Sequence, residues 1–185
     1  MERKIAMPPL ITTYTGKHFD ITRPLPEAIC IEDIAHALSL ICRGNGHVRS
    51  FYSVGQHCLQ CAREAEARGL SRRLILAALL HDGTECYMSD VPRPLKEVMP
   101  IYRQTEKGLL DIICRKFLDT PLTAAEMKIL KEIDDAFLWY DLTYLLDDQP
   151  DTPQPQVCCP PDYTLRPFAD VEREYLAFYK RCQEV

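Results

Sequence analysis

Apolar residues recur at steps of three and four along most of the chain, a spacing that places them on one face of an α-helix. The clearest case predicts an amphipathic helix over residues 31–42 and comprises Ile31, Ile34, Ala35, Leu38 and Ile41. Arg43-Gly44-Asn45-Gly46 follows directly. Glycine and asparagine tolerate the left-handed backbone that closes a helix, so we expect the helix to end there.

The same spacing predicts further helices. One runs from Ser53 to about Arg68, and Ser71 can cap another that contains the apolar stretch Leu74–Leu80. Two more are expected over roughly residues 102–117 and 168–182. The segment 87–100 is expected to form a loop or short helical turns, because it contains three prolines, Pro92, Pro94 and Pro100.

A long helix is predicted from the capping box of Thr123 and Glu126 to about Leu146. Its buried face should carry Met127, Leu130, Phe137, Leu138 and Leu145. Asp134 and Asp141 fall on this face, whereas Asp135 lies about 100° away and should be more exposed. Burial of a carboxylate is costly unless it is paired, so Asp134 requires a basic side chain or a bound cation.

The fold class that follows is all-α, a single-domain helical bundle over residues 1–185. We place its core at about 27–147, and 148–185 are expected to be a proline-rich connector and a C-terminal helix. One short edge strand is expected at residues 11–15, ending at Gly16.

The composition of the chain limits which partners it can bind and where in the cell it is expected. A net charge of −5 without a dense Lys/Arg block excludes general attraction to nucleic acid or to an anionic membrane. Leu74–Leu80 is too short to span a membrane, and the run Ile5-Ala6-Met7 ends at Pro8 and Pro9, too soon for a signal peptide. The nine cysteines are an odd number without regular spacing. We therefore expect a cytoplasmic protein with free thiols, in which Cys58 and Cys61 serve as packing residues rather than as a redox or zinc site.

Residues suited to metal binding stand at helix positions that should be buried. His81 and Asp82 directly follow the apolar stretch, and His57 lies near the buried stripe of its helix. Together with Asp134 they form a mixed nitrogen and oxygen ligand set. Such a set suits Mn, Fe, Co, Ni or Zn better than Mg or Ca, which prefer oxygen ligands.

The order His57, His81-Asp82, Asp134 resembles the signature of the HD-domain phosphohydrolase superfamily. Four further segments, residues 31–38, 51–58, 78–85 and 89–96, resemble its small bacterial branch related to 5′-deoxynucleotidases. The resemblance covers roughly residues 10–145 and implies metal ligation by His57, His81, Asp82 and Asp134.

The resemblance also implies roles for cavity residues. Glu85 matches the acid that positions the attacking water and would act in catalysis with Asp82. Arg43 matches an arginine that holds the substrate phosphate, Asp90 a carboxylate beside the sugar, and Lys96 a second phosphate contact. A metal-dependent 5′-nucleotidase that releases phosphate from (deoxy)nucleoside monophosphates is therefore expected. A homodimer is expected on the same grounds.

One position departs from the family pattern. Relatives in this branch often carry an aromatic residue directly after the arginine, where this chain has Gly44. The loss of a large side chain leaves a roomier pocket and leaves the sugar preference open. Two alternatives therefore stand beside the monophosphatase: a deoxynucleoside triphosphate triphosphohydrolase and a nucleotide-sensing module without turnover.

Overall fold

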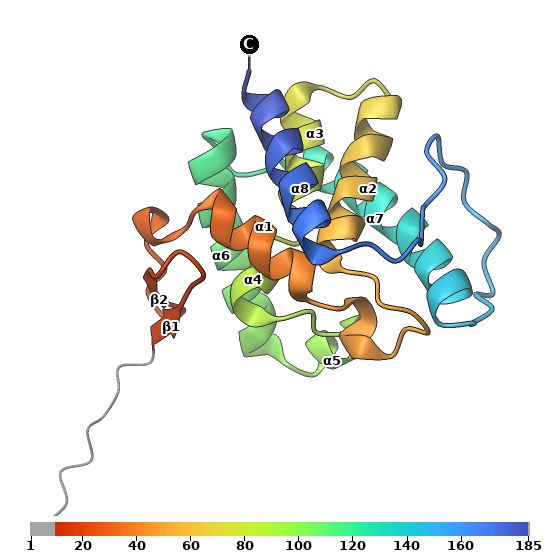
Figure 1. Cartoon of the computed structure of the whole chain (residues 1–185), viewed down its shortest axis with the longest axis horizontal. Helices are drawn as coiled ribbons and strands as arrows, with labels where there is room; N and C mark the ends of the chain where they lie inside the picture. Colours follow the sequence, from red (N-terminus) through yellow and green to blue (C-terminus); the bar gives the residue numbers. More distant parts are fainter. Residues whose placement is uncertain (1–9, 185) are drawn as a thin grey trace, which may run out of the picture.

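Helices make up most of the chain and pack around one hydrophobic core (Figure 1). The computed structural model describes residues 10–184, so the run Ile5–Met7 and the prolines after it lie outside the described residues. The predicted all-α, single-domain bundle is confirmed. None of the helices between residues 10 and 184 combines the length and the apolar character that a membrane crossing requires.

The first three helices match the predicted ranges closely. They are α1 (Ile31–Leu40), α2 (Val54–Ala67) and α3 (Arg72–Leu80). The predicted cap at Ser71 is present, because its side chain accepts the Leu74 N–H at 3.3 Å. Ser53, where the preceding helix was expected to start, also caps its helix by accepting the Gln56 N–H at 3.1 Å. Local capping therefore fixes where the helices that carry the histidines begin.

The remaining helices fill the second half of the chain. The proline-containing segment forms two short helices, α4 (Glu85–Met88) and α5 (Arg93–Glu97). They are followed by α6 (Pro100–Leu118), α7 (Ala124–Leu145) and α8 (Phe168–Gln183). The capping box at Thr123 and Glu126 opens α7 as predicted.

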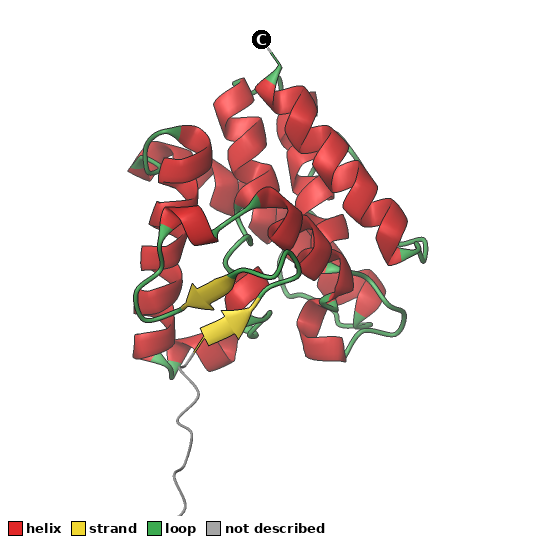
Figure 2. Cartoon of the chain, turned by 60° about the vertical axis from the view of Figure 1, so that its left-hand side comes forward, coloured by secondary structure: helices red, strands yellow, loops and turns green. Residues whose placement is uncertain are grey.

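The N-terminal strand is part of a hairpin rather than a lone edge strand. Strand β1 (Leu10–Thr12) pairs antiparallel with β2 (His18–Asp20), and Ile11 lies opposite Phe19 (Figure 2). Gly16 does not end the strand but occupies the turn between the two, with a φ of 78°. The second strand was not predicted, because three residues are too few to show the alternation of apolar and polar positions. Its central residue, Phe19, is fully buried in the core.

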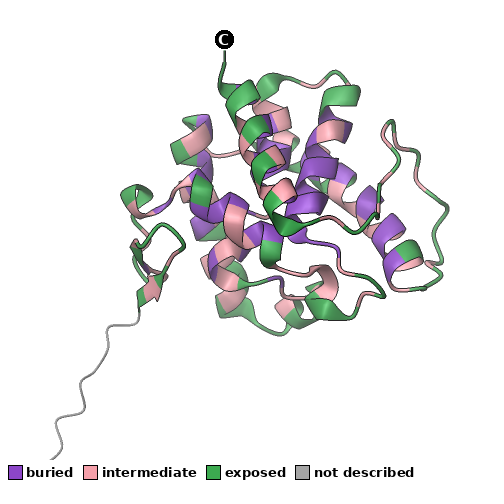
Figure 3. Cartoon of the chain, in the orientation of Figure 1, coloured by how far each residue is buried: buried purple, intermediate pink, exposed green. Residues whose placement is uncertain are grey.

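The centre of the molecule is the contact between α2 and α3, which are the most continuously buried helices (Figure 3). Helix α8 packs against α1, α2 and α3 and contributes Val171, Tyr175 and Phe178 to the core. The hydroxyl of Tyr175 donates to the Leu79 carbonyl at 2.6 Å. Helix α8 thereby holds the end of α3, directly before His81.

Most of the predicted buried face of α7 is correct. Leu130, Phe137 and Leu145 are buried, and the side chain of Asp134 is 26% exposed against 41% for Asp135. Met127 was expected on this face but is 46% exposed. It lies in the first turn of α7, where its side chain lines an open surface cavity instead of the core.

The segment between α7 and α8 lies against the bundle through hydrogen bonds. The Trp139 indole donates to the Thr152 carbonyl at 3.0 Å, and the Tyr140 hydroxyl donates to the Pro155 carbonyl at 2.9 Å. The buried Glu64 carboxylate accepts the N–H groups of Cys158 and Cys159, each at 2.8 Å. The connector is therefore anchored to α2 and α7 at several points.

The start of α7 gives a pH-dependent prediction. Hydrogen bonds from Arg73 and from the Thr123 N–H lower the pKa of Glu126 to about 2 from its ordinary value of 4.5. A lowered folded-state pKa stabilises the fold above pH 4.5, and this stabilisation is lost as the pH falls toward 2. Glu126→Gln should reduce the free energy of unfolding by about 1 kcal/mol at neutral pH and by progressively less in acid.

Urea unfolding of the two proteins between pH 7 and pH 3 measures this difference. Glu132→Gln, an exposed position on the same helix, is the matched control and should leave the profile unchanged. Parallel profiles for the wild type and Glu126→Gln would contradict the assignment.

Candidate metal centre and adjoining cavity

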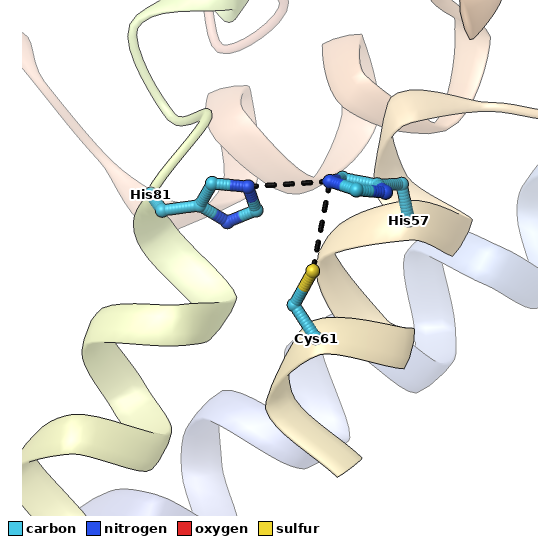
Figure 4. A group of neighbouring side chains, drawn as sticks. All are labelled: His57, Cys61 and His81. Carbon is cyan, nitrogen blue, oxygen red and sulfur yellow. Dashed lines mark hydrogen bonds between the residues drawn. The ribbon is translucent and has the colours of Figure 1, made fainter. Parts of the chain in front are cut away.

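Two histidines from neighbouring helices meet at the centre of the bundle. His57 lies in the first half of α2, and His81 directly follows the last residue of α3. Their Nε2 atoms are 3.3 Å apart and point toward each other, and the planes of the two rings are tilted by 53° (Figure 4). His57 is only 1% exposed, so its ring nitrogen requires a partner inside the protein.

Two carboxylates complete the group that the sequence predicts. Asp82 Oδ2 lies 3.3 Å from His81 Nε2 and 3.7 Å from His57 Nε2. Asp134 Oδ1 lies 3.2 Å from His57 Nε2 and 3.9 Å from His81 Nε2. Two ligands about 2.1 Å from one ion are about 3.0 Å apart at right angles and about 4.2 Å apart when opposite. All four distances fall in this range, so the four side chains converge on one point.

Two thiols lie next to this group. Cys61 Sγ is 3.5 Å from His57 Nε2 (Figure 4). The ligand atoms of Cys58, His81 and Asp82 also lie within 4.8 Å of one another. The two cysteines pack in the core as expected, but they also reach the histidines. Two groups that could hold a metal ion thus share His81: one consists of His57, Cys61 and His81, the other of Cys58, His81 and Asp82. The signal that could have found Cys61 is its position four residues after His57, one helical turn along α2.

The charges in the cluster favour a cation. Burial alone would lower the pKa of His81, but the charge of Asp82 raises it well above its ordinary value. Burial would raise the pKa of the carboxyl groups, yet the charge of His81 lowers that of Asp82, and hydrogen bonds from His57 and His81 lower that of Asp134. The carboxylates therefore remain ionised and attract positive charge, which a divalent ion would supply.

Asp141 joins the histidine cluster to Arg43. Its Oδ2 lies 3.1 Å from Arg43 Nη2 and 3.6 Å from His57 Nδ1, on the far side of the ring from the cluster. Its Oδ1 accepts the Tyr163 hydroxyl at 2.9 Å. The sequence places Asp141 on the buried face of α7 but gives it no role. The seven-residue spacing from Asp134, two helical turns, could have indicated it as a second site residue.

A cavity of about 410 Å³ opens beside the cluster. Every polar residue that the sequence analysis assigned to substrate or water handling lines it, as do Asp82 and Asp134. The charged lining consists of Arg43, Arg93, Lys96, Asp82, Glu85, Asp90, Asp134 and Asp141. The apolar lining on the side of α7 consists of Val48, Leu138, Leu142, Leu145 and Leu146. The cavity thus has a charged end at the cluster and an aliphatic wall.

Glu85 reaches the cavity from a tight turn. The chain leaves α3 at Leu80, and the Glu85 N–H donates to the Asp82 carbonyl at 2.9 Å, so a turn rather than a continuing helix sets their spacing. Glu85 is 3% exposed, and among the described residues its Oε2 has no hydrogen-bond partner. Burial, and then the charges of Asp82 and Asp90, raise its pKa well above the ordinary value. A carboxyl group in such surroundings holds a proton more readily than a solvated one.

Arg43 and Gly44 are positioned by carboxylates. Arg43 Nη1 lies 3.5 Å from Asp82 Oδ2, and the Gly44 N–H donates to Asp90 Oδ2 at 2.9 Å. Gly44 adopts a φ of 60°, the left-handed region that favours glycine. One oxygen of Asp90 is therefore used to hold this turn, in addition to any contact that Asp90 makes in the cavity.

The fold and site define a helical protein with a buried histidine–carboxylate–thiol cluster at the end of a cavity. No family model matches the chain. The chain is 35% identical over 140 residues to YfdR of Escherichia coli K12, an uncharacterized protein, across 70% of the chain and 76% of YfdR. It is also 38% identical over 116 residues to the uncharacterized protein RCAP_rcc00048 of Rhodobacter capsulatus, across 60% of the chain and 53% of that protein. The chain therefore belongs to the protein family of YfdR.

The contacts of Asp141 yield a prediction on metal binding. Asp141→Asn keeps the size of the side chain but removes the charge that faces His57 Nδ1 and Arg43. Loss of such an outer partner of a metal-binding histidine reduces metal affinity by about 10–100-fold. Calorimetric titration of the metal-free protein with Mn²⁺ measures it. Asp148→Asn, an exposed residue beyond the end of α7, is the control. Equal affinities for Asp141→Asn and the wild type would contradict the role of Asp141.

Proposed function

We propose that this protein is a metal-dependent phosphohydrolase that releases phosphate from nucleoside monophosphates. The observation that carries the proposal is the single cavity in which Arg43, Lys96 and Glu85 face the carboxylates of the histidine cluster. A phosphate bound at this end would contact a basic side chain, a proton acceptor and the metal-binding residues at once. The family resemblance of the sequence supports the same activity.

His57, His81, Asp82 and Asp134 are the proposed ligands of the ion. Their two nitrogens and two carboxylates suit Mn, Co, Ni, Fe or Zn better than Mg. A divalent ion bound there would act as a Lewis acid on a phosphoryl oxygen and on water. Asp82 and Asp134 line the cavity, so an ion held by these four residues would be accessible to water and phosphate from the cavity side.

Arg43 is the proposed phosphate-binding residue. Its contacts with Asp141 and Asp82 fix the guanidinium at the edge of the cavity. Burial opposes its charge, but these carboxylates raise its pKa well above the ordinary value, so it stays cationic. A planar, charged guanidinium held in place before substrate arrives can pair with two phosphoryl oxygens without further ordering.

Glu85 is the proposed proton acceptor. Among the described residues its Oε2 has no hydrogen-bond partner, its side chain lines the cavity, and Lys96 Nζ lies 3.6 Å from its Oε1. In the proposed step, water attacks phosphorus, its proton passes to Glu85 Oε2, and the bond between phosphorus and the ester oxygen breaks. The released hydroxyl oxygen takes up a proton, so that nucleoside and orthophosphate leave.

The cavity lining favours a monophosphate over a triphosphate. Three basic side chains, Arg43, Arg93 and Lys96, face five carboxyl groups there. A divalent ion would only balance this excess of negative charge, which leaves little attraction for the additional charges of a triphosphate. The aliphatic wall from Leu138 to Leu146 offers an apolar surface for the nucleoside. Gly44 adds no side chain to that wall, so we expect tolerance at the sugar.

The setting of the proposed enzyme is cytosolic. All nine cysteines are unpaired, which supports a reducing compartment. The small-molecule substrate, without nucleic acid or membrane partner, and the homodimer expected from the resemblance stay predictions.

Turnover of a nucleotide panel tests the activity. Metal-free protein is loaded with Mn²⁺, Co²⁺, Ni²⁺, Mg²⁺ or Zn²⁺ and incubated with deoxy- and ribonucleoside monophosphates and with deoxynucleoside triphosphates. We expect orthophosphate from monophosphates with Mn²⁺, and none from a variant that combines His81→Ala with Asp82→Ala. Release of intact triphosphate would replace the proposal with the triphosphohydrolase. A thermal shift with nucleotide but no product would replace it with a sensing module.

The role of Glu85 gives a second measurement. Glu85→Gln removes the proton acceptor but keeps the shape, so kcat should fall by about 10²–10⁴-fold, while KM and Mn²⁺ affinity change little. Glu132→Gln, on the exposed side of α7, is the control and should keep the wild-type kcat. A kcat within two- to three-fold of the wild type, on the order of experimental scatter, would rule out Glu85 as the base.

A further inference from the structure

The thiol of Cys61 occupies a position that the proposed phosphohydrolase does not require. Cys61 is 1% exposed, and its sulfur lies 3.5 Å from His57 Nε2, the nitrogen that also faces His81 and Asp134 (Figure 4). A buried cysteine of purely structural value needs only apolar neighbours. Here the sulfur instead lies beside the imidazole nitrogen of His57, and the ligand atoms of Cys61, His57 and His81 all lie within 4.8 Å of one another.

The distances around Cys61 fit a four-coordinate zinc site. Ligands at about 2.0–2.1 Å for nitrogen and about 2.3 Å for sulfur, arranged tetrahedrally, are about 3.3–3.6 Å apart. The separations are 3.3 Å from His57 to His81, 3.5 Å from His57 to Cys61, and 3.3 Å from His81 to Asp82. The separation of 3.7 Å from His57 to Asp82 is close to this range.

We propose that the histidine pair binds ions in two alternative modes that differ in one ligand. In the first mode, described above, Asp134 completes the set for a hard or borderline ion such as Mn²⁺. In the second, the Cys61 thiolate replaces Asp134, and Zn²⁺ is held by His57, Cys61, His81 and Asp82. The inference rests on the proposed metal centre but not on its substrate.

The surroundings of Asp134 explain how it can be replaced. Its side chain is 26% exposed, and its second oxygen lies 3.3 Å from Arg93 Nη2, at the cavity side. The carboxylate thus has an alternative cationic partner when it leaves the ion. Cys61 has no such freedom, because α2 buries it directly beside the histidines.

The exchange has a defined chemical balance. When Zn²⁺ binds in the second mode, the Cys61 S–H bond breaks, the proton passes to solvent and a zinc–sulfur bond forms. Soft thiolate ligands favour Zn²⁺ over Mn²⁺, so only the thiophilic ion gains from this mode. A tetrahedral ion with four protein ligands keeps no position open for water, which is the property of structural rather than catalytic zinc sites. Zn²⁺ should therefore inhibit the protein that Mn²⁺ activates.

Spectroscopy of the metal-loaded protein tests the second mode without any assay of turnover. The metal-free full-length protein, Cys61→Ala and Cys58→Ala are titrated with Co²⁺ and, separately, with Zn²⁺ and Mn²⁺. We expect a near-ultraviolet thiolate-to-cobalt charge-transfer band in the wild type and in Cys58→Ala, and its loss in Cys61→Ala. Zn²⁺ affinity of Cys61→Ala should fall by about ten-fold or more, while Mn²⁺ affinity stays that of the wild type.

X-ray absorption of the zinc-loaded wild type gives a readout that needs no variant, should Cys61→Ala fail to fold. One sulfur at about 2.3 Å from zinc supports the proposal. A shell of nitrogen and oxygen alone overturns it, as does a charge-transfer band that disappears in Cys58→Ala but persists in Cys61→Ala. Failure of the nucleotide assay would leave these spectra unaffected, so the two proposals fail separately.

Discussion

The central physical constraint of this structure is the burial of several carboxylates among histidine and arginine side chains. Asp141 contacts Arg43 and His57, and Arg43 in turn approaches Asp82. Ionised groups are stable in such a place only when each has an opposite charge or a hydrogen-bond donor. The arrangement of the helices meets this requirement: α2 carries His57, α3 ends directly before His81, and α7 carries Asp134 and Asp141.

Much of the fold was accessible from the sequence because the signals were local. The caps at Ser71 and Thr123 and the apolar steps along the chain predicted the helices that carry His57 and Asp134 and the helix that leads into His81. Periodicity also ranked Asp134 as less exposed than Asp135, which the structure bears out. Met127 was misplaced because periodicity identifies a face but does not say how far along the helix a neighbour covers it.

The parts of the site that escaped the sequence depend on contacts between distant segments. The sequence predicts Cys61 only as a packing residue, because it does not show that His81, from another segment, lies near the sulfur. The sequence predicts that Asp141 lies on the buried face of α7 but not which residues contact it, because Arg43 and Tyr163 are distant from it along the chain. The turn that brings Glu85 beside Asp82 is likewise fixed by tertiary packing, because α3 ends before the two residues.

The hydrogen bonds that anchor the segment between α7 and α8 limit where its length can change. Cys158, Cys159 and Tyr163 bond to buried carboxylates on α2 and α7, and the Tyr163 hydroxyl bonds to the same carboxylate that faces His57. Changes of loop length are tolerated best where the backbone carries few buried contacts. Insertions and deletions are therefore compatible with residues 147–151, just after α7, whereas the stretch from Cys158 to Tyr163 is constrained in both length and register. The second part of this segment is thus held as firmly as a helix, although none of it belongs to one.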